Sequence, residues 1–146
     1  MNKLLWRISD HADLSGRGGM LSAARWHDRG QLIVYAAESS TGALTELLAH
    51  TDRDLVPPDF QLLTLEVGNA TEISDAPALQ AGWTKNLPGT RAIGNAWLAS
   101  GKSALLRVPS ALISHAHNVL INPLHPDASE IRIVSRERLV LDKRLK

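Results

Sequence analysis

The stretch RWHDRGQLIVYAAESSTGALTELLAH, residues 25–50, predicts a strand followed by a helix and decides the fold we expect for the chain. Residues 32–36 read as a buried strand and contain the only tyrosine, Tyr35. Residues 41–50 then carry apolar side chains at helical spacing. Ser39 or Ser40 can cap that helix by accepting a hydrogen bond from a free backbone N–H group. We therefore expect a rigid strand–helix unit at the centre of the fold.

Side chains of three types that bind or transform ligands lie on this unit. Glu46 lies beside the apolar face of the predicted helix, and its neighbours three and four positions away are mostly small. Arg25 and Trp26 precede the strand, which Tyr35 closes. One cation, one ring and one carboxylate are therefore expected close together. Each alone is more often structural, as a salt bridge, a packed ring or a solvated charge on a helix.

The composition indicates one globular domain. The 146 residues suffice for one domain with a real core and are too few for two. The net charge is +1 and the 16 basic residues are spread along the chain, which argues against direct nucleic-acid binding. Without cysteine, neither a disulfide framework nor a thiolate metal site is expected. The first residues lack the apolar core of a signal peptide and no run reaches the ~20 apolar residues that span a bilayer, so a cytoplasmic protein without membrane contact is expected.

The remaining pattern predicts an α+β fold. Further strands are expected at residues 4–8, 61–67, 104–108 and 119–121, with a closing hairpin at 131–134 and 139–141. A second helix is expected at 91–100, capped by Thr90 and closed by Gly101. Residues 15–19, SGRGG, read as a flexible loop, and residues 69–89 read as irregular. The scattered strands and two helices predict a single domain, residues 1–146, with a small mixed sheet and flanking helices.

Several familiar kinds of site are disfavoured. His115 and His117 lack further ligands at a known spacing, so no metal site is expected. No G-x-S-x-G motif supports a serine hydrolase. Polar residues do stand at the ends of predicted elements: Arg7, Arg25, Tyr35, Glu46, Arg91, Ser110 and Asn122. Arginine suits a pyrophosphate, tyrosine stacks on a heteroaromatic ring, and a carboxylate stabilises an oxocarbenium-like centre. Cleavage of a dinucleotide at its glycosidic bond is one interpretation among several.

Motifs along nearly the whole chain resemble the RES-domain family, toxins of bacterial toxin–antitoxin pairs whose antitoxins are Xre-like helix-turn-helix proteins. The resemblance rests on the order and spacing of LWRIS, of RW followed by Gly30, and of VYAAES, LTELLAH, TRAIGNAWLASG, LRVPSALI, NPLHPD and IRIVS. One departure is Ala23-Ala24, where family members often have Gly-Gly before the Arg-Trp pair. Alanine restricts the backbone there and can shift Arg25 slightly.

The resemblance implies a fold similar to the ADP-ribosyltransferases and a toxin that depletes NAD+ by cleaving its nicotinamide–ribose bond. Position by position, it implies that Arg25 holds the phosphates, that Tyr35 lines the nicotinamide or ribose pocket, and that Glu46 is the catalytic carboxylate. Candidate substrate-binding residues of lower rank are Arg7, Trp26, Ser110 (the motif serine) and Asn122. NAD+ is then the substrate, and no cofactor or metal is expected.

The acceptor of the ADP-ribose stays open. Water makes the enzyme a glycohydrolase, inorganic phosphate makes it a phosphorylase, and a protein side chain makes it a mono-ADP-ribosyltransferase. A non-catalytic NAD+-binding or interaction module is an alternative of another class, and a ribonuclease toxin is disfavoured by the even charge. The expected partner is a cognate Xre-like antitoxin whose tail blocks the pocket, with a toxin homodimer inside that complex expected by analogy.

Overall fold

The computed structural model describes residues 2–145, so Met1 and Lys146, the two ends of the predicted domain, lie outside the described residues. The strands are β1 (Lys3–Ser9), β2 (Val34–Ala37), β3 (Gln61–Val67), β4 (Ile73–Asp75), β5 (Leu105–Pro109), β6 (His117–Ile121) and β7 (Ile131–Arg138). The helices are α1 (Arg17–Leu21), α2 (Ser40–His50) and α3 (Leu87–Ser100), and the short 3₁₀ turns are η1 (Arg53–Leu55), η2 (Trp83–Lys85) and η3 (Pro126–Glu130).

The strands form one mixed sheet in the order β4-β5-β6-β2-β1-β3-β7. Only β4 and β5 run parallel among the described strands, and the other neighbours are antiparallel. This arrangement confirms the predicted α+β class with a mixed sheet and flanking helices.

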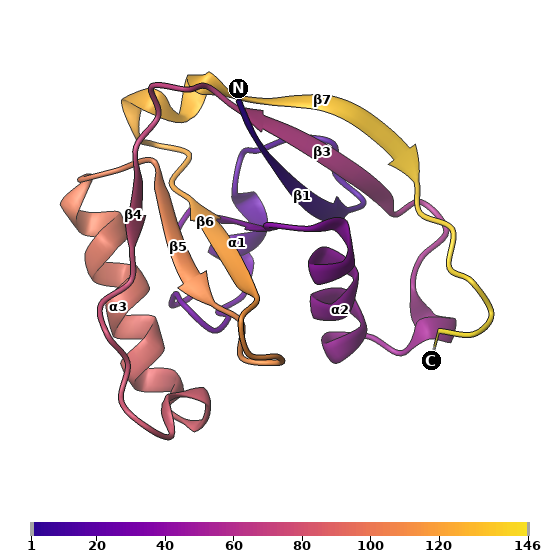
Figure 1. The fold of residues 1–146 in the computed structure, drawn as a ribbon, viewed down its shortest axis with the longest axis horizontal. Helices are drawn as coiled ribbons and strands as arrows, with labels where there is room; N and C mark the ends of the chain where they lie inside the picture. The colour runs from indigo at the N-terminus through magenta and orange to yellow at the C-terminus, as the bar shows by residue number, and fades with distance from the viewer. Residues whose placement is uncertain (1, 146) are drawn as a thin grey trace.

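The sheet turns sharply between β2 and β1, so that its two halves run at a steep angle to each other (Figure 1). At that junction the register holds one pair, Trp6 with Ala37, whereas β1 and β3 pair along all of β1. The main core lies between the halves and consists of buried aliphatic side chains, among them Leu5, Leu63, Leu65, Val34, Leu105, Val119 and Ile121. Burial of these side chains is the largest source of stability for the bent sheet.

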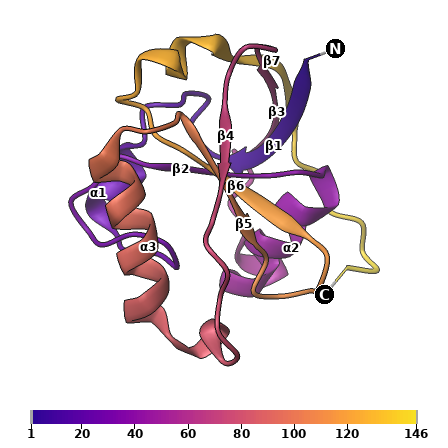
Figure 2. The same cartoon turned by 60° about the vertical axis from the view of Figure 1, so that its left-hand side comes forward.

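A second core lies on the other face of the β5–β6–β2 half, where α3 covers the strands (Figure 2). Successive side chains of a strand point to opposite faces, so Leu106 and Leu120 leave the first core and pack with Trp97 of α3 and with Trp26. Tyr35 is paired with Leu120 across β2 and β6, so its ring points to this face as well. The side chains of the predicted site are therefore carried beside the second core.

Most predicted elements are confirmed within one or two residues. The expected strands at 4–8 and 61–67 are β1 and β3, and those at 104–108 and 119–121 are β5 and β6. The central strand begins two residues later than expected, at Val34. The helix expected at 41–50 is α2, and its cap is Ser39, whose Oγ accepts the Gly42 N–H at 2.9 Å.

The predicted closing hairpin is wrong. Residues 131–138 form the single strand β7, which pairs with β3, and residues 139–141 lie beyond it. The Leu139 N–H donates to the Phe60 carbonyl, so the chain runs on past the first residue of β3 instead of turning back. The loop expected at 15–19 is also partly wrong, because Arg17–Leu21 form the short helix α1.

Two further boundaries differ from expectation. The segment predicted to be irregular contains the edge strand β4, which is too short to show a period of alternation. Helix α3 begins before Thr90, and its cap is Asn86, whose Oδ1 accepts the Gly89 N–H at 3.0 Å. Gly101 closes the helix at φ 60°, as predicted. None of the helices within residues 2–145 combines the length and the apolar character that crossing a bilayer requires.

Candidate active site

A pocket of about 430 Å³ lies between α2, the junction of β1 with β2, and the segment of residues 23–26. Its lining joins side chains that are far apart in the sequence. Among them are Trp6, Arg7, Arg25, Trp26, Tyr35, Glu46, His50 and Asn118. The bend of the sheet creates this hollow, because α2 leaves β2 at the point where the two halves separate.

The Glu46 carboxylate is held by two neutral donors. Its Oε1 accepts a hydrogen bond from Asn118 Nδ2 at 2.9 Å and a longer one from Ser110 Oγ at 3.3 Å. Asn118 comes from β6, and Ser110 directly follows β5, so the orientation of the carboxylate depends on both strands and on α2. Neutral amide and hydroxyl donors orient the group without cancelling its charge. The carboxylate therefore remains available to interact with positive charge in the pocket.

The Tyr35 hydroxyl belongs to a buried chain of hydrogen bonds. It accepts the Trp26 N–H at 3.0 Å and lies 2.8 Å from His27 Nδ1, while His27 Nε2 lies 3.0 Å from the Gly19 carbonyl oxygen. Because a carbonyl can only accept, Nε2 carries the proton in the neutral ring, and Tyr35 donates to Nδ1. Burial raises the pKa of the Tyr35 phenol far above its ordinary value, against smaller opposing effects of the Trp26 N–H and of Arg91 and Arg25. The Tyr35 ring thus lines the pocket, and its neutral hydroxyl group forms hydrogen bonds with Trp26 and His27.

Helix α3 clamps the segment of residues 24–26 from the other side. Arg91 Nε donates to the Ala24 carbonyl at 2.8 Å, and Thr90 Oγ1 donates to the Arg25 carbonyl at 2.6 Å. Gly94 faces the Trp26 carbonyl so closely that any side chain at Gly94 would clash with it. Helix α3 thus holds the carbonyls of this segment, and Tyr35 of β2 holds the Trp26 N–H. These contacts set the position of Arg25.

The Arg25 guanidinium lies at the edge of the pocket over an aromatic ring. Its Cζ is 6.0 Å from the centroid of the Trp83 ring, and its Nη1 donates to the Thr84 carbonyl at 2.9 Å. Arginine carries five N–H donors, so several stay available for an anion. Trp26 packs its ring 5.8 Å from that of Trp83 and is only 2% exposed, so most of it belongs to the core.

Arg7 places a second, more deeply buried cation in the pocket wall. Its Nη1 donates to the Tyr35 carbonyl at 3.1 Å, and its Nε is buried without a hydrogen-bond partner among the described residues. Burial lowers the pKa of the Arg7 guanidinium, although the charges of Asp13 and Asp10 act in the opposite direction. A guanidinium nevertheless stays protonated in proteins. A buried charge with spare donors is well suited to an anionic ligand.

The structure gathers most of the predicted site residues in one place. Arg7, Arg25, Trp26, Tyr35 and Glu46 all line the pocket, and Ser110 reaches it through its hydrogen bond to Glu46. Asn122 does not line it. Its Oδ1 accepts the Leu124 N–H at 3.1 Å and shapes the turn after β6. The roles proposed for these residues stay predictions.

Sequence reasoning missed several residues of the site. Asn118 lies two positions before Leu120 in β6, so its side chain points to the same face of the sheet as Leu120 and Tyr35 once the strand is known. His50 lies one helical turn after Glu46, and that spacing was a usable signal. His27 is 2% exposed, and nothing in the local sequence indicates that it contacts Tyr35. Among residues 2–145, no group of three or more His, Asp or Glu side chains is placed to hold a metal ion.

Comparison with known proteins identifies the family. The sequence profile of the RES domain matches residues 4–142. The chain belongs to the RES domain family. The family resemblance drawn from the sequence motifs is thereby confirmed.

Relatives of this RES domain carry toxin names. The protein "Toxin Res" of Pseudomonas putida is 43% identical over 134 residues, which is 89% of this chain and 91% of the relative. The "Prs ADP-ribosylating toxin" of Sphingobium sp. is 34% identical over 99% of this chain and 98% of its own. "Toxin Res" of Photorhabdus laumondii is 36% identical over 90% of this chain and 86% of the relative.

A solved structure shares the fold of this RES domain. It is similar to a chain in the crystal structure of the M. tuberculosis MbcT-MbcA toxin-antitoxin complex, with a TM-score of 0.75 at 16% identity. The match covers 96% of this chain and 85% of the other. At that identity, the likeness concerns the fold alone.

Proposed function

We propose that this RES domain is the toxin of a toxin–antitoxin pair and depletes NAD+ by cleaving the bond between nicotinamide and ribose. The observation that carries the proposal is the Glu46 carboxylate, oriented by neutral donors in a pocket whose wall also holds Arg7 and Arg25. Two guanidinium groups suit a pyrophosphate, and a carboxylate suits a sugar carbon that gains positive charge. The names of the relatives, "Toxin Res", support the toxin part of this proposal.

The chemistry requires little acid–base machinery. Nicotinamide in NAD+ is already a cationic leaving group, so it departs with the bonding electron pair as a neutral molecule and needs no general acid. In our proposal, Arg25 and Arg7 hold the pyrophosphate, the Tyr35 ring seats the nicotinamide, and Glu46 stabilises the positive charge that develops on the ribose. Such preorganised electrostatic stabilisation supplies several kcal/mol of barrier reduction in many enzymes.

The direct test is NAD+ consumption by the purified protein, with separation of the products, in buffers with and without phosphate. Loss of NAD+ with release of nicotinamide would support the proposal, and the second product would name the acceptor. Binding of NAD+ without loss would point instead to a non-catalytic NAD+-binding module.

A Glu46→Gln variant isolates the role of charge. The glutamine Oε1 can still accept from Asn118 and Ser110, so we expect normal folding, whereas NAD+ turnover should fall by roughly 10²–10³ because the developing charge is no longer compensated. Glu137→Gln, on the exposed part of β7, is the matched control and should turn over NAD+ like the wild type. Full activity of Glu46→Gln would remove Glu46 from the mechanism.

A second candidate function is ADP-ribosylation of a protein. The relative named "Prs ADP-ribosylating toxin" favours it, because it aligns with 99% of this chain at 34% identity. The same pocket would then pass the ADP-ribose to a side chain of a target protein. Transfer of label from adenine-labelled NAD+ to a protein would support this function, and free ADP-ribose as the sole product would exclude it.

We also propose an Xre-like helix-turn-helix antitoxin as the partner, whose tail occupies the pocket. The structure similar to this chain comes from a toxin-antitoxin complex. The antitoxin encoded beside this toxin should suppress NAD+ loss when it is added in equimolar amount. An antitoxin that binds without suppressing turnover would contradict occupation of the pocket.

A further inference from the structure

A second, smaller pocket adjoins the active-site pocket on the far side of Glu46. Its volume is about 270 Å³, and it lies between the first turns of α2 and the loop that joins β5 to β6. Glu46 and Asn118 line both pockets. The catalytic carboxylate therefore stands between two hollows, and each can bring a molecule to it.

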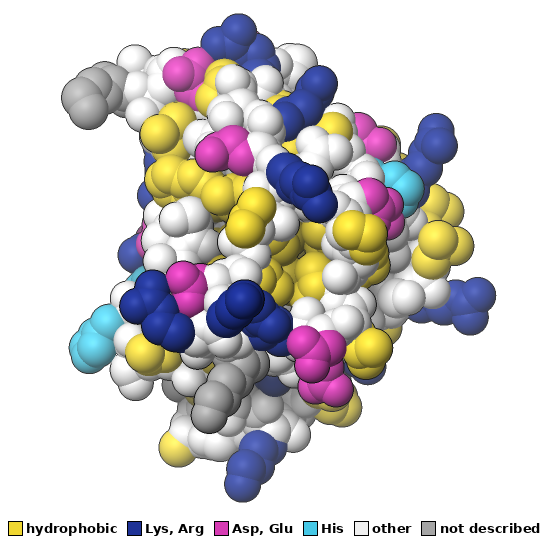
Figure 3. All heavy atoms as spheres, turned by 90° about the vertical axis from the view of Figure 1, so that its right-hand side faces the viewer, with side chains coloured by type: hydrophobic (Ala, Val, Ile, Leu, Met, Phe, Trp, Pro, Cys, Tyr) yellow, Lys and Arg dark blue, Asp and Glu magenta, His cyan; other side chains and the backbone are white. Residues whose placement is uncertain are grey.

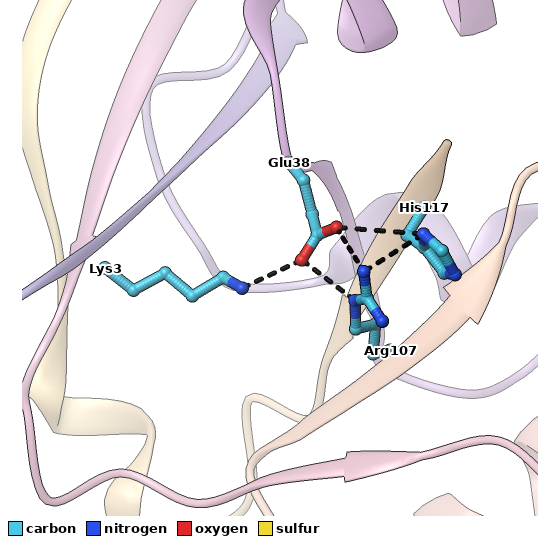
Figure 4. A network of polar contacts seen from close by, with 4 residues as sticks. All are labelled: Lys3, Glu38, Arg107 and His117. Atoms are coloured by element: carbon cyan, nitrogen blue, oxygen red, sulfur yellow. Dashed lines mark hydrogen bonds and ion pairs between the residues drawn. The ribbon is translucent and has the colours of Figure 1, made fainter. Parts of the chain in front are cut away.

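One wall of this side pocket is fixed by ion pairs (Figure 4). Glu38 accepts hydrogen bonds from both Arg107 Nε and Nη2 at 3.0 Å, and from Lys3 Nζ at 2.8 Å. His117 Nδ1 lies 3.1 Å from Arg107 Nη2, and its ring also lines the pocket. Burial acts to raise the pKa of the Glu38 carboxyl, but the hydrogen bonds and charges of Arg107 and Lys3 hold it below its ordinary value. The wall is thus rigid, and the charge of Glu38 is compensated.

The remaining lining combines small polar residues with the apolar side chains of Ile113 and Ala116. Ser39, Thr45 and Ser110 line the hollow, and Gly42 leaves room at the start of α2. The loop on the opposite side is held by the Ser110 N–H, which donates to the Ala116 carbonyl at 2.9 Å. Within it, His115 has the left-handed backbone conformation, φ 68°, which few side chains adopt. The polar part of this lining suits a small ligand that forms hydrogen bonds.

We propose that this side pocket admits the acceptor of the ADP-ribose, a small hydroxylic nucleophile such as water or protonated inorganic phosphate. The inference rests on the proposed function. The C–N bond between ribose and nicotinamide breaks, and its electron pair leaves with nicotinamide. The acceptor oxygen forms the new bond to the ribose carbon, and its proton passes to solvent along the Glu46 carboxylate. NAD+ and the acceptor thus reach Glu46 from different sides.

A bulky side chain at Thr45 tests this route. Thr45 is exposed on α2 and lines the side pocket but not the active-site pocket. We expect Thr45→Trp to bind NAD+ with unchanged affinity and to turn it over about tenfold more slowly or worse, because the acceptor is misplaced. Thr41→Trp, one helical turn earlier and also exposed, lines neither pocket and is the matched control. It should behave like the wild type.

The assay measures NAD+ affinity and turnover separately for the wild type, Thr45→Trp and Thr41→Trp, without phosphate and with inorganic phosphate added. Slow turnover of Thr45→Trp alone, at unchanged affinity, supports the acceptor route, and free or phosphorylated ADP-ribose identifies the acceptor. Equal turnover of the two variants overturns the route while the proposed function stands. Weaker NAD+ binding by Thr45→Trp also overturns it, because NAD+ would then occupy the side pocket. No NAD+ loss by the wild type removes the proposed function and the route together.

Discussion

At the scale of single residues, the Tyr35 hydroxyl supports the site through hydrogen bonds to Trp26 and His27. The hydroxyl accepts a hydrogen bond from the Trp26 N–H and donates one to His27, whose other ring nitrogen donates to the Gly19 carbonyl. The residue that presents its ring to the pocket therefore also holds the backbone next to Arg25.

We expect Tyr35→Phe to retain the ring and lose this connection. The free energy of unfolding should fall by about 1–3 kcal/mol, because the Trp26 N–H and His27 Nδ1 lose a buried partner. The KM for NAD+ should rise more than kcat falls, since Arg25 loosens while Glu46 is unaffected. Denaturant unfolding and steady-state kinetics check both effects. The double variant Tyr35→Phe with His27→Leu should lose less stability than the sum of the two single variants. Additive losses would contradict coupling through the hydrogen bond between these two side chains.

At the scale of elements, helix α3 positions the site although it contributes no side chain to the lining of the pocket. Its Thr90 and Arg91 bind the carbonyls of Arg25 and Ala24, and Gly94 lets the helix approach the Trp26 carbonyl. The close approach requires glycine for space, because Gly94 has ordinary helical geometry.

Gly94→Ala should separate α3 from the segment that carries Arg25. The methyl group would clash with the Trp26 backbone, so we expect a loss of about 1–3 kcal/mol in stability, together with weaker NAD+ binding. Thermal unfolding and NAD+ titration measure the two effects. Gly18→Ala, in α1 with open space around the new methyl group, is the control and should leave both nearly unchanged. A stable, fully active Gly94→Ala protein would show that α3 does not set the position of Arg25.

At the scale of the whole molecule, the ion pairs of Glu38 join both halves of the bent sheet. Lys3 comes from β1, whereas Arg107 comes from β5 (Figure 4). Elsewhere on the surface, the face at the right of Figure 1 carries basic and acidic side chains interleaved with apolar ones (Figure 3). The described side chains of that face thus form no concentrated basic patch of the kind typical of nucleic-acid binding.

Glu38 makes the free energy of unfolding depend on pH in the acidic range. Its pKa is lower in the folded state than the ordinary value of about 4.3, so its contribution is present at neutral pH and is lost as pH falls through the folded pKa. At pH 7, Glu38→Gln should be about 1–2 kcal/mol less stable than the wild type. Near pH 3 the difference should shrink. Urea unfolding at both pH values tests this, and a difference independent of pH would contradict the ion-pair account.

Sequence reasoning predicted elements best where the signal was local. The alternation along residues 61–67 and the cap at Ser39 depend on neighbouring residues, and both predictions are confirmed. The predictions of the closing hairpin and of the cap at Thr90 failed because distant partners decide both features. β7 pairs with β3 along its length, and the Thr90 hydroxyl donates to the Arg25 carbonyl. Local pattern alone could not reveal either partner.

The sequence by itself determined the α+β class, the central strand–helix unit, the RES family and the residues Arg25, Tyr35 and Glu46 of the candidate site. Only the tertiary structure decided how these side chains are held. Asn118 reaches Glu46 across 72 positions of sequence, and His27 meets Tyr35 only because α1 and β2 enclose it. Helix α2 lines both pockets, which are closed by β1 and β2 in one case and by the loop between β5 and β6 in the other. The physical reason is that local propensity sets the elements, whereas hydrogen bonds between elements and shared burial set the geometry of a site.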